Sequence, residues 1–140
     1  MKDRIKRKVS SLCNQYKTTD PYDLAYKLGI FLLKQDLGSS LDGFYFVENG
    51  RRFIGINAAL PDYKQRYTLC HELGHAVMHP EHNTLWMKKN TLYAGSKYEK
   101  EADLFAVSLL AQDMDELPDT LGAFASNVGM DAKMIMKLFE

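Results

Sequence analysis

The 140-residue chain carries 18 lysine and arginine residues against 18 aspartate and glutamate residues, so the formal net charge is zero and gives no global attraction to nucleic acid. The length suits one domain (residues 1–140) with its own core. No apolar run could span a membrane, no apolar region follows the basic N-terminus as in a secretory signal, and two cysteines make no disulfide framework, so we expect a cytoplasmic protein without a membrane partner.

The first two predicted elements are helices. Residues 1–17 place four apolar side chains on one helical face: Ile5, Val9, Leu12 and Tyr16. Residues 1–10 hold five lysine or arginine residues. They could form an electrostatic arm for an acidic partner, although a solvated helix face is the favoured interpretation. Asp20 and Pro21 provide a cap and a first helical residue for the second helix, which Gly29 ends.

A small sheet is predicted next. Residues 30–34 and 43–48 have strand character, and Asn49-Gly50 predicts a hairpin to residues 51–57. The expected fold class is therefore α+β, with a small antiparallel sheet packed on helices. The sequence does not show which strand lies at the edge.

The next predicted helix contains His71-Glu72-Leu73-Gly74-His75, an H-E-x-x-H pattern, and Pro80 stops it. On a helix, the two histidines lie about 5–6 Å apart at Cβ on one face. That spacing lets both imidazoles bind one zinc ion. Glu72 is rotated away from the histidines and can reach a zinc-bound water without being a ligand, as in metalloproteases.

A second helical pattern, residues 98–111, provides a candidate for the third ligand. Glu99 and Asp103 share a face with small alanines, which would let another helix approach closely. A catalytic zinc usually takes three protein ligands and a water, so Glu99 is the candidate third ligand. Asp103 is placed to accept a hydrogen bond from a ligand histidine. Glu101 points about 200° away from Glu99 and is interpreted as a solvated, lysine-paired residue.

The stretches H-E-L-G-H-A-V-M-H-P and E-x-E-A-D-x-F-A-x-x-L-L resemble the ImmA/IrrE family of metallopeptidases, which are of the Glu-zincin type. The resemblance covers most of residues 18–112 and departs after Leu110, where the family often has a Met-Pro pair. It implies a zincin-like fold, zinc as cofactor, ligands His71, His75 and Glu99, and Glu72 as general base. It also implies a cytoplasmic protease that cleaves a repressor or similar regulator, often of phage or mobile-element origin. In zincins the edge strand beside the site holds substrate, and the resemblance suggests that role for the predicted hairpin.

Other residues near the motif receive weaker interpretations. His79 continues the histidine stack but lies a further turn along, so it is expected to support a ligand or to face substrate. The connection 80–97 is expected to border the cleft, with Trp86 as a substrate contact or a loop anchor. Cys70 is interpreted as a buried, inert thiol. Four residues are candidates to stabilise the oxyanion: His79, His82, Tyr93 and Tyr98.

The C-terminal part, residues 113–140, resembles a helix–turn–helix but is predicted to close the core. Residues 114–140 hold five acidic residues and two lysines, a net charge of −3, which opposes binding to phosphates. No direct nucleic-acid binding is therefore expected. The predicted function is a zinc-dependent, site-specific endopeptidase with a protein substrate. The alternative is a zinc-binding regulatory module that acts on a transcriptional regulator without cleaving it.

Overall fold

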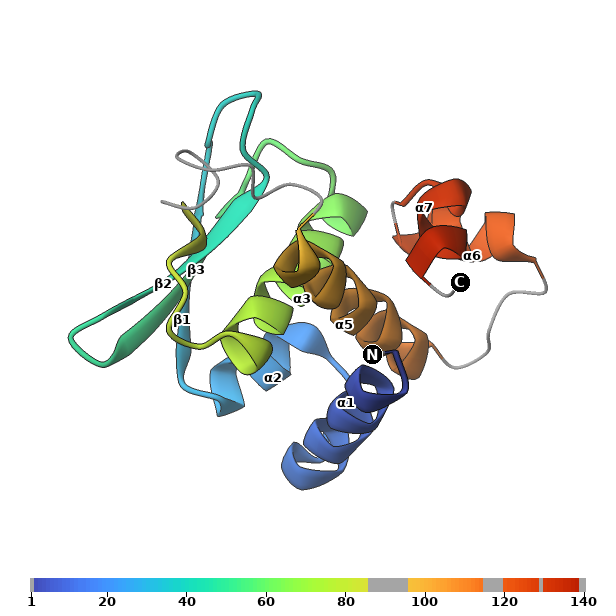
Figure 1. Cartoon of the computed structure of the whole chain (residues 1–140). Helices are drawn as coiled ribbons and strands as arrows, with labels where there is room; N and C mark the ends of the chain where they lie inside the picture. The colour runs from blue at the N-terminus through green and yellow to red at the C-terminus, as the bar shows by residue number, and fades with distance from the viewer. Residues whose placement is uncertain (1, 86–95, 115–119, 129, 139–140) are drawn as a thin grey trace.

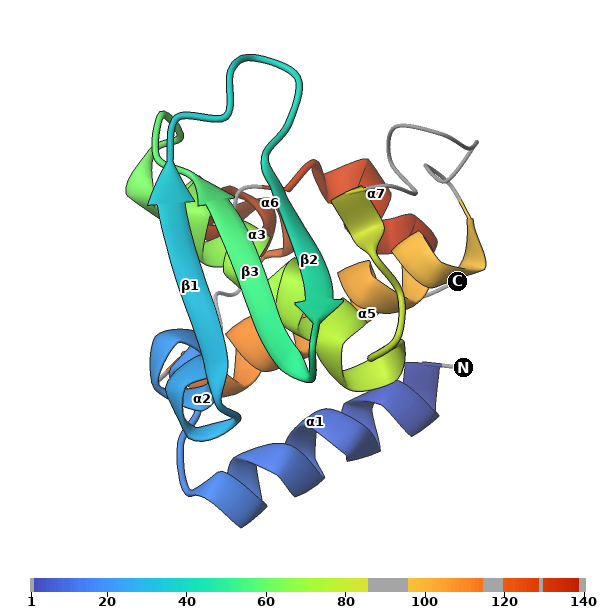
Figure 2. The same cartoon turned by 90° about the vertical axis from the view of Figure 1, so that its left-hand side faces the viewer.

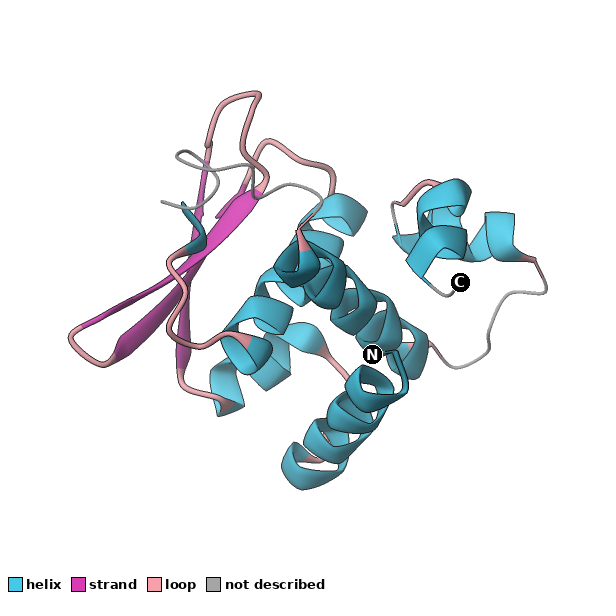
Figure 3. Cartoon of the chain, in the orientation of Figure 1, coloured by secondary structure: helices cyan, strands magenta, loops and turns pink. Residues whose placement is uncertain are grey.

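The computed structural model describes residues 2–85, 96–114, 120–128 and 130–138 (Figures 1 and 3). Within these ranges the elements follow in this order: α1 (Lys2–Tyr16), α2 (Pro21–Lys27), β1 (Ile30–Gln35), β2 (Gly43–Glu48), β3 (Arg51–Asn57), α3 (Asp62–Met78), α5 (Lys97–Asp113), α6 (Leu121–Val128) and α7 (Ala132–Leu138). The α+β class is confirmed. None of the described helices combines the length and the apolar character that a membrane span needs.

The described strands form a mixed sheet in the order β1-β3-β2. β2 pairs with β3 as the predicted antiparallel hairpin. Asn49 and Gly50 have φ values of 51° and 76°, the positive angles that a type I′ turn needs. β1, however, runs parallel to β3, so the expectation of a purely antiparallel sheet is wrong. The reason is that β3 returns between β1 and β2, so it is antiparallel to its hairpin partner and parallel to the strand on its other side.

Helices cover one face of the sheet, with α3 directly behind the strands and α5 behind α3 (Figures 1 and 2). Fully buried apolar side chains from the sheet and the helices form one core, and the largest are Tyr45, Phe105, Ile5, Leu24, Ile54, Ile56, Leu69, Leu73, Leu104, Leu109 and Ile135. Each such aliphatic or aromatic side chain contributes about 1.5–3 kcal/mol by leaving water. Ala125, Val128 and Ile135 bring α6 and α7 into the same cluster.

The close approach of α3 and α5 depends on Gly74. A Cβ atom at Gly74 would lie 3.0 Å from the Cβ of Phe105 and 3.1 Å from the Cα of Ala102. Contacts this short are tighter than almost all real Cβ contacts, so a side chain here would require the neighbouring backbone of α5 to move, and glycine lets the two helices meet without that shift. Gly74 lies between the two motif histidines, and this packing therefore brings the histidine face of α3 next to the start of α5.

Candidate metal centre

Two histidines of α3 direct the same type of ring nitrogen at one carboxylate oxygen of α5. The Nε2 atoms of His71 and His75 lie 3.3 Å and 2.8 Å from Oε1 of Glu99. Both rings are buried, and His75 is 0% exposed. The structure thus brings together the three residues that the sequence singled out as ligands. They form a compact set of two imidazoles and one carboxylate.

Glu99 is held in place by the start of its own helix. Ser96 is the N-cap of α5, and its Oγ accepts a hydrogen bond from the backbone N–H of Glu99 at 3.3 Å. Such caps fix the first turn of a helix. Glu72 also has a carboxylate near the histidines, because ligand atoms of His71, Glu72 and His75 lie within 4.8 Å of one another. Glu99, however, contributes the single oxygen that both Nε2 atoms contact.

The second ring nitrogen of His71 is bound by Asp103. Its Nδ1 lies 2.8 Å from Oδ1 of Asp103, and the Tyr67 hydroxyl donates to the same oxygen at 2.5 Å. Burial raises the pKa of Tyr67 well above its usual value, and the charge of Asp103 raises it further, so the hydroxyl keeps its proton. The sequence assigned no role to Tyr67, although it lies four residues before His71 on the same helical face.

The second ring nitrogen of His75 faces another histidine. The Nδ1 atoms of His75 and His79 lie 3.3 Å apart, and Nε2 of His79 lies 3.2 Å from Oε1 of Glu101. Glu101 is only 4% exposed and also pairs with Arg4 of α1. The interpretation of Glu101 as a solvated residue is therefore wrong. The periodicity of α5 could not reveal this, because the partner comes from a helix almost a hundred residues earlier.

The charges at the site depend on one another. Burial lowers the pKa of His71, but the hydrogen bonds to Asp103 and Glu99 outweigh burial and raise it to about 10. Burial raises the pKa of Glu99, but the hydrogen bonds to His71 and His75 outweigh it and hold the pKa well below its usual value. Without a metal, His71 is therefore a protonated imidazolium between two carboxylates. A divalent cation bound by these residues would replace that proton.

Glu72 lies beside the sheet. It is 1% exposed, and the Thr84 hydroxyl lies 3.4 Å from its Oε1. Thr84 also accepts a hydrogen bond from the backbone N–H of Tyr45 at 2.7 Å and lies 3.2 Å from the Tyr45 carbonyl oxygen. Among the described strands, β2 is the sheet edge beside α3. Thr84 occupies the outer backbone groups of Tyr45 in this strand. Thr84 was not predicted to lie here, because no sequence motif marks it.

Gly43 lets the start of β2 lie against α3 next to Glu72. A Cβ atom there would lie 2.5 Å from Cγ2 of Thr68, 2.7 Å from the carbonyl oxygen of Gly55 and 3.6 Å from Cγ of Glu72. The strand therefore approaches the helix more closely than any residue with a side chain would permit. This contact places the sheet edge beside the carboxylate of the motif.

Three of the four candidates for oxyanion stabilisation lie together. The rings of His79, His82 and Tyr98 pack together, with centroids 4.7–5.3 Å apart. Trp86 and Tyr93 lie outside the described residues. Cys70 is fully buried, and burial raises the pKa of its thiol, as expected of an inert cysteine.

Comparison with known proteins gives three findings. Residues 25–120 match the IrrE N-terminal-like domain of the M78 peptidases. The chain is 41% identical over 109 residues to uncharacterized immunity region protein 2 of Bacillus phage phi105, which covers 78% of this chain and 69% of the relative. It is 32% identical over 111 residues to the metallopeptidase ImmA of Bacillus subtilis strain 168, which covers 78% of this chain and 64% of that relative. The chain therefore spans about two thirds of the length of these relatives.

Proposed function

Because the chain belongs to the ImmA/IrrE family of metallopeptidases, we propose that it is a zinc-dependent endopeptidase that cleaves a repressor or another transcriptional regulator at a specific site in the cytoplasm. The observation that carries the proposal is the convergence of two Nε2 atoms on one oxygen of Glu99, with Glu72 next to them. The similarity to a phage immunity region protein supports a regulator as the substrate and a phage or mobile-element origin.

The donor set fits zinc. His71, His75 and Glu99 offer two imidazole nitrogens and one carboxylate oxygen, the combination that catalytic zinc takes in several peptidases. Asp103 would fix the tautomer of His71, since a hydrogen bond at Nδ1 leaves Nε2 free to bind. Zinc in this position would act as a Lewis acid that polarises the scissile carbonyl and lowers the pKa of a water molecule.

Glu72 would act as the general base. Its carboxylate lies within 4.8 Å of the histidine nitrogens but is not the oxygen that they share. It would take the proton from the attacking water and pass it to the leaving amine. Burial against β2 and the Thr84 hydroxyl restrict the directions in which the carboxylate can point. Thr84 occupies the outer backbone groups of Tyr45 in the edge strand β2, so an extended peptide could add to this strand only beyond Tyr45 or by displacing Thr84.

The competing function is a zinc-binding module that regulates transcription by contact alone. Glu72 distinguishes the two functions, because peptide hydrolysis needs a general base at this position and zinc binding alone does not. Glu72→Gln keeps the size of the side chain but cannot accept the proton. We expect it to bind zinc and fold normally while cleavage falls by at least about 10²–10⁴-fold, the range that general acid–base catalysis supplies.

The experiment compares wild type and Glu72→Gln in cells that carry the regulator encoded beside the gene. Both the length of the regulator and the transcription that it controls are measured. The endopeptidase proposal predicts a shortened regulator with wild type only. If Glu72→Gln relieves repression as well as wild type does, and neither protein shortens the regulator, the binding module is the correct function.

A further inference from the structure

A continuous chain of polar contacts leads from His75 to the surface helix α1. Nδ1 of His75 lies 3.3 Å from Nδ1 of His79, and Nε2 of His79 lies 3.2 Å from Oε1 of Glu101. The other oxygen of Glu101, Oε2, accepts a hydrogen bond from Nη2 of Arg4. His75, His79 and Glu101 are buried, whereas the side chain of Arg4 is 54% exposed. The contacts therefore join a buried ring to the outside of the molecule through two residues.

The direction of the hydrogen bonds follows from the position of Nε2 in His75. A neutral imidazole that offers Nε2 to a metal carries its proton on Nδ1 and must donate from there. Nδ1 of His79 is then the acceptor, which leaves the His79 proton on Nε2, where it donates to Glu101. The carboxylate in turn accepts from the guanidinium of Arg4, which is always charged. Every donor meets an acceptor under this one assignment.

We propose that His79 and Glu101 are positioning residues that fix the tautomer and orientation of His75, and that Arg4 anchors them from α1. The proposal rests on the zinc site of the proposed function. It gives the two ligand histidines different supports. His71 is held directly by the carboxylate of Asp103, whereas His75 is held by a carboxylate through an intervening histidine. Partners of this kind orient a ligand and increase its basicity.

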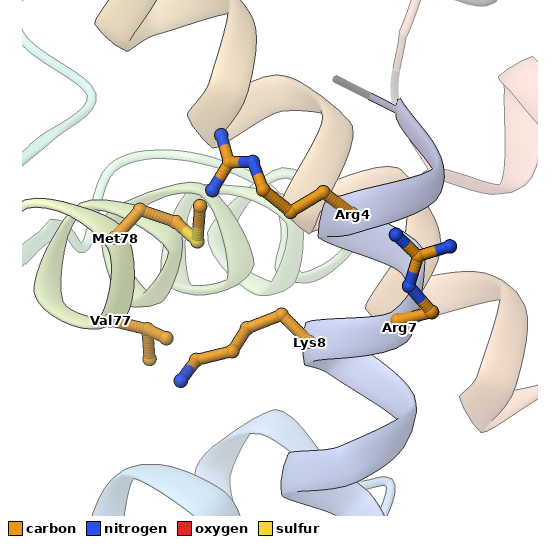
Figure 4. Close-up of a pocket in the computed structure, with 5 residues that line it drawn as sticks. All are labelled: Arg4, Arg7, Lys8, Val77 and Met78. Carbon is orange, nitrogen blue, oxygen red and sulfur yellow. The ribbon is translucent and has the colours of Figure 1, made fainter.

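The arrangement also gives α1 a specific part in the site. Arg4 extends from α1 towards the end of α3, where it lines an open pocket of about 400 Å³ with Arg7, Lys8, Val77 and Met78 (Figure 4). Arg7 lies one turn further along the same helix and lines the same pocket. It therefore serves as a matched control for the charge and the surface position of Arg4.

Zinc affinity, measured by competition with a chromophoric chelator, gives the first test. His79→Phe keeps an aromatic ring but removes both nitrogens, and we expect a loss of about 10–100-fold, as is typical of lost partners of this kind. Glu101→Gln and Arg4→Ala should lower the affinity in the same direction by smaller factors. Arg4→Lys should restore part of the loss, and Arg7→Ala should leave the affinity unchanged. Thermal unfolding of each metal-free variant identifies those that fail to fold.

The tautomers give a readout that a purely structural role would not change. The chain has four histidines, so long-range ¹H–¹⁵N correlations of the labelled, zinc-loaded protein can resolve each ring. We expect the proton on Nδ1 in His75 and on Nε2 in His79, and a shift of the His79 proton distribution in Glu101→Gln. Wild-type zinc affinity in both His79→Phe and Glu101→Gln would overturn the proposal, as would a His79 ring protonated on Nδ1 in wild type.

Failure of this inference differs from failure of the proposed function. Both readouts follow zinc binding and neither needs cleavage. A wild-type protein that binds zinc with the expected tautomers but cuts no regulator would remove the endopeptidase and keep the positioning role. A wild-type protein that cuts its regulator, while His79→Phe and Glu101→Gln both keep wild-type zinc affinity, would keep the endopeptidase and remove the positioning role.

Discussion

At the scale of single residues, the candidate site is defined by which nitrogen of each imidazole is committed elsewhere. Asp103 and His79 each occupy an Nδ1 atom, so both Nε2 atoms remain to face Glu99. With the opposite tautomers, each Nε2 atom would carry the proton and would have no lone pair to offer a metal. The H-E-x-x-H spacing is therefore necessary for the donor set, but the partners of the second nitrogens decide whether it forms.

Loss of a ligand should remove the metal. Purified wild-type protein is expected to contain about one zinc equivalent, because three protein ligands make one site. His71→Ala and Glu99→Gln should each reduce the zinc content to a small fraction of that value under the same purification. Elemental analysis alongside circular dichroism checks both the metal and the fold. Folded variants that keep wild-type zinc would show that these residues are not ligands.

Zinc affinity should also depend on pH through His71. Its pKa in the metal-free protein is raised to about 10, so below that pH zinc must displace a proton. We expect the apparent affinity to rise by up to about tenfold per pH unit between pH 6.5 and 8.5, since one proton leaves with each zinc bound. Chelator competition at several pH values measures this slope. An affinity that stays flat over this range would contradict the protonated state of His71.

The raised pKa of His71 makes zinc affinity rise with pH but makes the stability of the metal-free protein fall with pH. The folded-state pKa of His71 lies above its ordinary value of 6.5, so the stability it contributes is fully present below pH 6.5 and lost as pH rises through about 10. The free energy of unfolding without metal, measured in urea, should therefore fall over this range. His71→Asn removes this titration and should flatten that part of the curve.

At the scale of elements, the site exists because α3 and α5 are in close backbone contact at Gly74. Gly74 permits this, and it lies in the motif between His71 and His75. The matched comparison is Gly74→Ala with Gly122→Ala. Both add a methyl group in a helix, but nothing lies within 4 Å of a Cβ at Gly122. The second change should stabilise the protein by up to about 1 kcal/mol through helix propensity.

Gly74→Ala should instead destabilise the protein, by about 1–3 kcal/mol, because its close neighbours are backbone and Cβ atoms of α5 that cannot rotate away. It should also weaken zinc binding, since it pushes Glu99 away from the histidines. Urea unfolding and chelator competition measure the two effects. Equal stabilisation by both substitutions would show that the two helices can separate at little cost.

The elements also show what the sequence could predict. The helices of the site and the hairpin were predictable because their signals are local, namely a 3.6-residue period, a proline stop and the Asn49-Gly50 turn. The parallel pairing of β1 with β3 was not, since strand order depends on packing between distant segments. Glu101 and Thr84 were missed for the same reason. Their partners, Arg4 and Tyr45, lie 97 and 39 residues away in the chain.

At the scale of the whole molecule, zinc would add one more link between elements that already share a single hydrophobic core. The candidate ligands come from α3 and α5, and the residues that contact the second nitrogen of His75 reach α1. Thr84 connects the segment after α3 to the sheet edge. A metal bound only by the folded arrangement stabilises that arrangement against the unfolded chain. The effect should therefore extend to global unfolding and exceed a local tightening of the site.

Zinc is accordingly expected to raise the free energy of unfolding by about 2.7 kcal/mol at a free concentration 100 times its dissociation constant. For a chain of this size, that corresponds to a rise in Tm on the order of 10 °C. Differential scanning calorimetry with buffered zinc measures the shift, and His71→Ala in the same buffer is the control that should show none. A wild-type Tm that does not change with zinc would mean that the folded chain binds the metal no better than the unfolded chain does. Equal rises in wild type and His71→Ala would place the bound zinc away from the histidines of α3.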